Sequence, residues 1–137
     1  MNETVKIPAG TKVFIVEDDA FISSLLTKKF ESEGVVIATS STGDTAAADI
    51  KAAKPAIIIL DIMLPGIDGL QVLEQIKKDP ETQNIPVIML SNLGEKVQIE
   101  KAKKYGAVSF LIKATLSVDE IVGEVAKQLK VETMTRG

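Results

Sequence analysis

The sequence predicts an α/β protein built on a five-stranded parallel sheet with helices on both faces. Five short apolar runs show no alternation with polar residues, which is typical of strands buried on both faces. Segments with helical spacing separate these runs. A repeated strand–helix order favours parallel strands joined by right-handed crossovers. The length of 137 residues fits one domain of this kind.

The five predicted strands are rich in β-branched residues and leucine. They cover residues 13–16, 35–38, 56–60, 86–90 and 108–112. The first and third end abruptly in acidic residues, and the fifth ends at a lysine. These strand ends therefore carry the polar side chains that need an explanation.

The five predicted helices follow from apolar stripes or from alanine content, and from residues that start or stop helices. They lie at 22–30, 44–53, 70–76, 95–105 and 118–129. Gly34 and Gly106 stand where C-terminal caps are expected, and Ser117 is a plausible N-cap. Pro55 and Pro80 stop the second and third helices. The pattern is a strand followed by a helix, five times over.

Composition excludes several classes of chemistry. The chain has no cysteine and no histidine, so disulfides, thiolate or histidine zinc sites and serine–histidine triads are ruled out. The net charge of −3 disfavours a general affinity for nucleic acid, and an aromatic content of 4% disfavours base stacking. Carboxylates, lysines, hydroxyls and the backbone must therefore perform any reaction.

We expect a single domain over residues 12–130, with flexible ends at 1–11 and 131–137. The first ten residues contain no long apolar stretch, so they do not resemble a secretory signal. The longest apolar run, 56–60, is far too short to span a bilayer. The expected location is therefore cytoplasmic, without a membrane partner.

The ends of the predicted strands place reactive groups together. Ligands of open parallel sheets bind beyond the carboxyl ends of the strands. Glu17 and Asp18 follow the first strand, and Asp61 follows the third. If these strands are neighbours, the three carboxylates converge, and their mutual repulsion calls for a cation. Their hard oxygen ligands suit Mg²⁺, which keeps open coordination positions for phosphate oxygens.

An ionised aspartate such as Asp61 can attack phosphorus and form an acyl phosphate without a general base. Phosphoryl transfer mainly needs positioning and charge neutralisation. Lys113 after the fifth strand and the Ser91 hydroxyl after the fourth could each cover one phosphoryl oxygen. The catalytic candidates are therefore Asp61, Ser91 and Lys113.

Four motifs in this order resemble the receiver domains of two-component response regulators, of the chemotaxis-regulator type. They lie at 16–19, 59–69, 86–91 and 106–113, each around the end of a predicted strand. The resemblance covers roughly residues 12–129. It implies a flavodoxin-like sheet with strand order 2-1-3-4-5. It also implies phosphorelay signalling by a domain that catalyses its own phosphorylation.

The resemblance implies a role for each residue of the acidic pocket. Asp61 would be the phospho-acceptor, and Lys113 would pair with the phosphoryl oxygens. Asp18 would bind Mg²⁺ directly and Glu17 through water. The backbone carbonyl of Met63 would supply a further ligand. A sensor histidine kinase or a phosphotransfer protein would be the donor.

The resemblance also implies a switch. Ser91 would move toward the phosphoryl group, and the Phe110 ring would follow it. An unknown output protein would then bind the face made by the fourth helix, the fifth strand and the fifth helix. The apolar arc of the fourth helix is wider than packing needs, so we expect Ile99 and Phe110 to contribute to this face. Packing of Ile99 against a neighbouring helix is an equal alternative.

Four residues depart from the commonest family pattern. Ala114 replaces a proline after Lys113, which puts the usual cis bond there in doubt. Asn92 replaces a smaller residue, and Met63 and Leu93 replace polar residues that can position water. We expect these apolar side chains to slow loss of the phosphoryl group.

Two other functions remain open. A small phosphatase with an aspartyl nucleophile would typically carry a second aspartate two residues after it, where this chain has Met63. A pseudo-receiver that only docks partners would be expected to lose an acidic residue or the lysine, and this chain keeps both. Taken singly, Ser91 could be a loop serine, Lys113 a strand-end lysine and Phe110 a core residue.

Overall fold

The computed structural model describes residues 7–92 and 95–136, with side chains described as far as Lys130. The five strands form one parallel sheet with the order β2-β1-β3-β4-β5, which confirms the predicted fold class. The strands are β1 (Lys12–Val16), β2 (Val36–Ser40), β3 (Ile57–Asp61), β4 (Val87–Ser91) and β5 (Ser109–Ile112). Each strand differs from its predicted bounds by one or two residues, and β3 and β4 include the polar residue at their ends.

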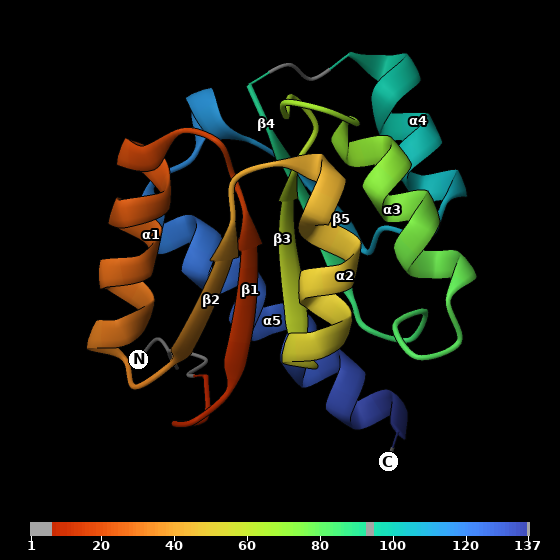
Figure 1. The fold of residues 1–137 in the computed structure, drawn as a ribbon. Coiled ribbons are helices and arrows are strands. Elements are labelled where there is room, and N and C mark those ends of the chain that lie inside the picture. Colours follow the sequence, from red (N-terminus) through yellow and green to blue (C-terminus); the bar gives the residue numbers. More distant parts are fainter. Residues whose placement is uncertain (1–6, 93–94, 137) are drawn as a thin grey trace.

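Helices cover both faces of this sheet (Figure 1). They are α1 (Ala20–Ser32), α2 (Gly43–Ala53), α3 (Gly69–Lys78), α4 (Lys96–Lys104) and α5 (Val118–Arg136), with a short 3₁₀ turn, η1 (Lys113–Thr115). The side chains of α1 and α5 pack into one core, and those of α2, α3 and α4 into the other. Alternate strand residues feed the two cores. Val13 and Ile15 point to the first and Phe14 and Val16 to the second, as the period of two requires.

The edge strand β2 departs from the expectation of burial on both faces. Val36 is 48% exposed and Thr39 is also exposed, whereas every residue of β3 and β4 is buried. β2 hydrogen-bonds only to β1, so its outer side has no neighbouring strand among the described residues. Its apolar composition reflects β propensity as much as burial.

Capping residues end and begin the helices where the sequence indicates. Gly34 and Gly106 have φ angles of +81° and +100°, a region that glycine adopts without a steric penalty. Ser117 accepts a hydrogen bond from the Glu120 amide, while Glu120 accepts one from the Ser117 amide, so a capping box starts α5. These local signals are therefore confirmed.

The two ends of the chain are only partly described. Residues 1–6 of the expected N-terminal extension lie outside the described residues, and Ile7 is buried in the core beneath α1 and α5. The Gly10 amide donates to the Gly34 carbonyl. At the other end α5 continues to Arg136. The flexibility of both ends stays a prediction. No helix in the described part of the chain is long and apolar enough to cross a membrane.

Candidate functional site

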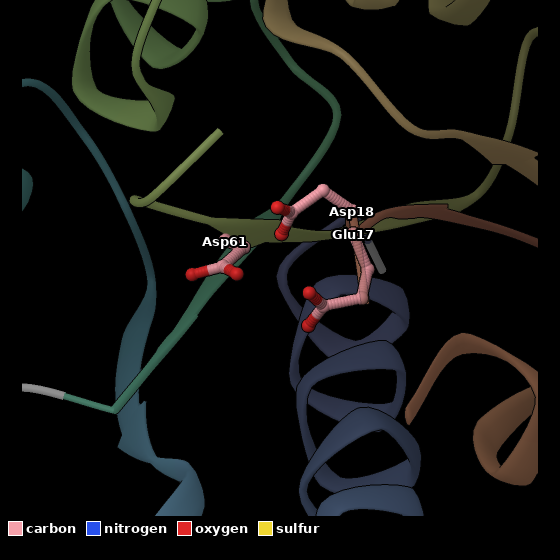
Figure 2. Close-up of side chains that lie close together, drawn as sticks. All are labelled: Glu17, Asp18 and Asp61. Carbon is pink, nitrogen blue, oxygen red and sulfur yellow. The ribbon is translucent and has the colours of Figure 1, made fainter. Parts of the chain in front are cut away.

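The carboxyl ends of β1 and β3 bring three carboxylates together, as expected from their position. β1 and β3 are hydrogen-bonded neighbours, with Val16 paired with Leu60. Glu17 and Asp18 therefore emerge next to Asp61. One oxygen from each of the three side chains lies within 4.8 Å of the others (Figure 2). Glu17 and Asp61 are buried, at 4% and 3% exposure, while Asp18 is exposed.

Lys113 completes the pocket from the opposite side. It follows β5 as the first residue of η1, and its side chain is only 9% exposed. Its Nζ lies 2.8 Å from Asp61 Oδ2 and 2.5 Å from Glu17 Oε1. The structure thus brings the Lys113 ammonium within ion-pair distance of Asp61 and Glu17, two of the three predicted carboxylates.

Burial sets the electrostatics of this pocket. Desolvation raises the pKa of Glu17 from 4.5 to about 7, and the charge of Asp61 adds to the rise. Hydrogen bonds from Lys113 and from the Asp19 amide act in the opposite direction without cancelling it. Burial by itself lowers the pKa of Lys113, but hydrogen bonds to Asp61 and Glu17 outweigh it and leave that pKa above its usual value. Lys113 therefore stays positively charged at neutral pH.

The donor set fits a hard divalent cation. Its ligands are carboxylate oxygens only, which magnesium and calcium prefer to softer donors. Two buried carboxylates face a single lysine, and the charge of Asp61 adds to the rise that desolvation causes in the pKa of Glu17. The exposed Asp18 leaves the pocket open to solvent on one side. A second positive charge at this place would relieve the repulsion.

Met63 lies in the loop that follows β3. Its side chain is 59% exposed, and its backbone N–H donates to Asp61 Oδ1 at 3.2 Å. That bond orients the Asp61 carboxylate from the side opposite Lys113, which binds Oδ2. The structure thus places Met63 beside the pocket. The role of its carbonyl as a metal ligand stays a prediction.

The two predicted switch residues come from neighbouring strands. Ser91 is fully buried at the end of β4, one residue beyond the pairing of Leu90 with Asp61. Phe110 is half-buried on β5, where it pairs with Met89 and packs against the core under α2, α3 and α4. The strand order therefore puts Ser91 beside Asp61. A coupled movement of the two residues stays a prediction.

Sequence analysis missed Gly69 as a supporting residue. A Cβ at this position would lie 2.0 Å from the Asp61 carbonyl oxygen, and the Gly69 amide donates to the Ile62 carbonyl at 2.8 Å. No other residue type fits this approach of α3 to the end of β3. Asp68 before it caps α3 in a capping box with Gln71. The Asp-Gly pair could have indicated a tight turn, but not what the turn touches.

The structure describes three of the four residues that depart from the family pattern. The Lys113–Ala114 peptide bond is trans. Asn92 is exposed at the end of β4, and Met63 lies beside the pocket, while Leu93 lies outside the described residues.

The apolar arc predicted for the fourth helix reaches the surface of α4. Val97 is 63% exposed and Ile99 is half-buried.

The known proteins that this chain resembles include receiver domains and response regulators. The family profile described as the response regulator receiver domain matches residues 13–126. The sporulation initiation phosphotransferase F of Bacillus subtilis is 32% identical over 122 residues, which cover 89% of this chain and 96% of that protein. The phosphate regulon transcriptional regulatory protein PhoB of Rhizobium meliloti is 33% identical over 119 residues, which cover 87% of this chain.

Solved structures resemble this fold closely. A putative response regulator from Chloroflexus aurantiacus superimposes with a TM-score of 0.81 at 26% identity, covering 88% of this chain and 98% of that one. A CheY-like receiver domain protein from Methanospirillum hungatei has a TM-score of 0.84 at 20% identity, covering 93% and 99%, which supports the fold alone. The chain spans only 52% of the PhoB protein and 42% of the ycf27 protein of Guillardia theta. These relatives therefore extend well beyond the part that is shared.

Proposed function

This chain belongs to the response regulator receiver domains, and from this premise we propose that Asp61 accepts a phosphoryl group from a phosphohistidine donor. One observation carries the proposal: a buried aspartate lies beside two further carboxylates and is paired with a buried lysine. Burying an acidic side chain costs free energy unless the side chain is paired, and the ion pair with Lys113 offsets that cost for Asp61.

The geometry prepares Asp61 for nucleophilic attack. The Lys113 ammonium donates a hydrogen bond to one carboxylate oxygen and the Met63 amide donates one to the other, so the group is held in a fixed orientation. In the transfer, a bond forms between an Asp61 oxygen and phosphorus. The bond between phosphorus and the donor imidazole breaks, and the imidazole leaves with its electron pair. Lys113 then compensates negative charge on the phosphoryl oxygens.

The metal called for by this chemistry is Mg²⁺. Asp18 and Asp61 would bind it directly, Glu17 would act through water, and the Met63 carbonyl would complete the protein ligands. When bound, the ion neutralises charge on the phosphoryl oxygens during transfer. The exposed position of Asp18 keeps the entrance open.

The output would be a change at the face formed by α4, β5 and α5. Ser91 lies beside Asp61, and Phe110 lies on the next strand toward α4, so the two residues connect the pocket to that face. A sensor histidine kinase or a phosphotransfer protein would act as the donor, and an output protein would bind the altered face. A cytoplasmic location agrees with such partners.

The direct test is mass spectrometry after incubation with a small phosphodonor and Mg²⁺. The wild type should gain the mass of one phosphoryl group, and Asp61→Asn should gain none. Asp49→Asn, which alters an exposed aspartate of α2, is the matched control and should react like the wild type. A folded wild type that gains no mass would contradict the proposal and favour a docking module that takes no phosphate.

The phosphatase alternative has little structural support. Such an enzyme would need an acid two residues after Asp61. The residue there is Met63, with a largely exposed thioether side chain that cannot donate a proton. Absence of phosphate release from small phosphomonoesters would exclude it.

A further inference from the structure

The helix α2 begins without a side-chain cap. Its N-cap residue, Thr42, makes no capping hydrogen bond with its side chain. The first amides of a helix have no partner inside the helix and need one from outside. The Gly43 amide finds it in the Pro65 carbonyl, at 3.1 Å. Residues 62–68, which we call the β3–α3 loop, therefore cap α2.

The contact is closer than any side chain would allow. A Cβ added to Gly43 would lie 1.9 Å from the Ile67 carbonyl oxygen and 2.9 Å from its carbon. Both are backbone atoms, which cannot yield as the end of a flexible side chain can. Nearby, Gly66 has a φ of +80° and lies against the carboxylate of Asp44 in the first turn of α2. Figure 1 shows that α2 begins at the same edge of the sheet at which β3 ends.

The β3–α3 loop also hydrogen-bonds to Asp61, the proposed phospho-acceptor. The Met63 amide donates to Asp61 Oδ1, and the far end of the loop is fixed where the Gly69 amide meets the Ile62 carbonyl. Between these points, Pro65 and Ile67 lie on the start of α2. A displacement of Ile67 must therefore be absorbed by the few residues between it and Met63.

We infer that Gly43 is a positioning residue: by admitting the β3–α3 loop against α2, it sets the place of the Met63 amide and thereby the orientation of Asp61. The inference rests on the proposed function of Asp61. It assigns a part in that site to a residue of α2 that touches neither Asp61 nor the phosphoryl group. Groups that orient a ligand without touching the substrate typically change metal affinity or activity 10- to 100-fold when altered.

The test is Gly43→Ala, studied as a folded protein well below its unfolding temperature. Without metal, the NMR signal of the Met63 amide should shift, because its hydrogen bond to Asp61 changes. Mg²⁺ affinity and the rate of phosphoryl acceptance from a small phosphodonor should each fall about tenfold. The urea midpoint should fall as well, so stability alone does not decide the question.

Gly106→Ala is the matched control for destabilisation. Gly106 has a φ of +100°, so alanine is strained there too. The three heavy atoms nearest to its Cβ would belong to the Lys77 side chain, the closest at 3.5 Å, and Gly106 precedes β5 whereas the pocket residue Lys113 follows it. This variant should lose stability yet keep the Met63 signal, the Mg²⁺ affinity and the reaction rate of the wild type. Equal losses in both variants would mean that Gly43 has a merely structural role.

A folded Gly43→Ala protein with the Mg²⁺ affinity, Met63 signal and rate of the wild type would overturn the inference. If Gly43→Ala does not fold, Asp44→Ala replaces it. That change removes the carboxylate against which Gly66 lies and adds no atoms, and it should lower affinity and rate in the same direction. Unchanged values there would equally overturn the inference. A wild type that takes no phosphoryl group would instead contradict the proposed function.

Discussion

At the scale of single residues, the pocket holds more negative charge than one lysine can neutralise. Glu17 and Asp61 are both buried and both pair with Lys113. Desolvation raises the pKa of Glu17 to about 7, so the ionised form of this side chain is disfavoured in the folded protein. The cost of charging Glu17 is the physical reason why a cation would bind here.

The raised pKa of Glu17 predicts how the free energy of unfolding varies with pH in the absence of metal. Because the pKa of Glu17 is raised, the folded state holds its proton more tightly than the unfolded state does. The contribution of Glu17 is therefore fully present below pH 4.5 and is lost as pH rises toward about 7. In EDTA, the free energy of unfolding should fall across this window less steeply in Glu17→Gln than in the wild type.

Urea unfolding at several pH values measures this difference. Glu100→Gln, which removes an exposed carboxylate from α4, is the control. Identical pH slopes in Glu17→Gln and in the wild type would show that Glu17 does not titrate differently in the folded protein.

We expect phosphorylated Asp61 to lose its phosphoryl group slowly because Met63 stands two residues after it. The Met63 backbone amide binds Asp61, and its exposed thioether cannot hold a water by a strong hydrogen bond. In Met63→Asn, an amide could hold the attacking water. One such bond, worth about 1 kcal/mol, corresponds to about fivefold faster dephosphorylation. The change should leave the fold intact because the side chain is 59% exposed. An unchanged decay rate of the phosphorylated protein would contradict this expectation.

At the scale of elements, α3 and α4 lie on the same face of the sheet but are held very differently. α3 buries four residues and begins with a capping box. α4 buries Ala102 alone among its residues, and its N-cap Glu95 makes no side-chain capping bond. Within the described residues, the buried Oε1 of Gln98 has no hydrogen-bond partner, a further cost to this position of the helix. The described contacts thus hold α4 more weakly than α3.

Hydrogen exchange should show this contrast. Segments with few buried apolar contacts open at lower free energy than the core. Amides of α4 should therefore exchange through local opening, while those of α3 exchange at free energies close to global unfolding. Native-state exchange at increasing urea separates the two cases. Equal protection of α3 and α4 would contradict the expectation that α4 opens locally.

At the scale of the whole molecule, a cation in the pocket would stabilise the entire fold. The pocket joins side chains at the carboxyl ends of β1, β3 and β5, so unfolding destroys it. A ligand that binds only the folded state adds RT ln(1 + [L]/Kd) to the free energy of unfolding. Binding at the sheet edge is therefore measurable as global stability.

Asp18 offers the cleanest test of this linkage. Its side chain is exposed, so Asp18→Asn should change stability little in EDTA. Mg²⁺ at 100 times Kd should stabilise the wild type by about 2.7 kcal/mol. Asp18→Asn should show a much smaller gain at the same concentration. Equal gains in the two proteins, measured by urea unfolding, would place the bound ion elsewhere.

Much of the architecture could be predicted from local patterns. Apolar runs identified all five strands to within two residues, and Gly34, Gly106 and Ser117 ended or began helices where expected. Such signals act within a few residues of the chain, so they are readable without coordinates. The family resemblance supplied the strand order, which local patterns do not contain.

The sequence alone therefore determined the strand–helix order, the charged residues at the ends of the first, third and fifth strands, and the candidate residues of the pocket. Only the tertiary structure decided that Lys113 reaches both Asp61 and Glu17, that β2 is half-exposed, and that Gly43 meets Ile67. The physical reason is distance along the chain. Lys113 and Asp61 are 52 residues apart, and no periodicity records which distant backbone a side chain or a missing Cβ will face.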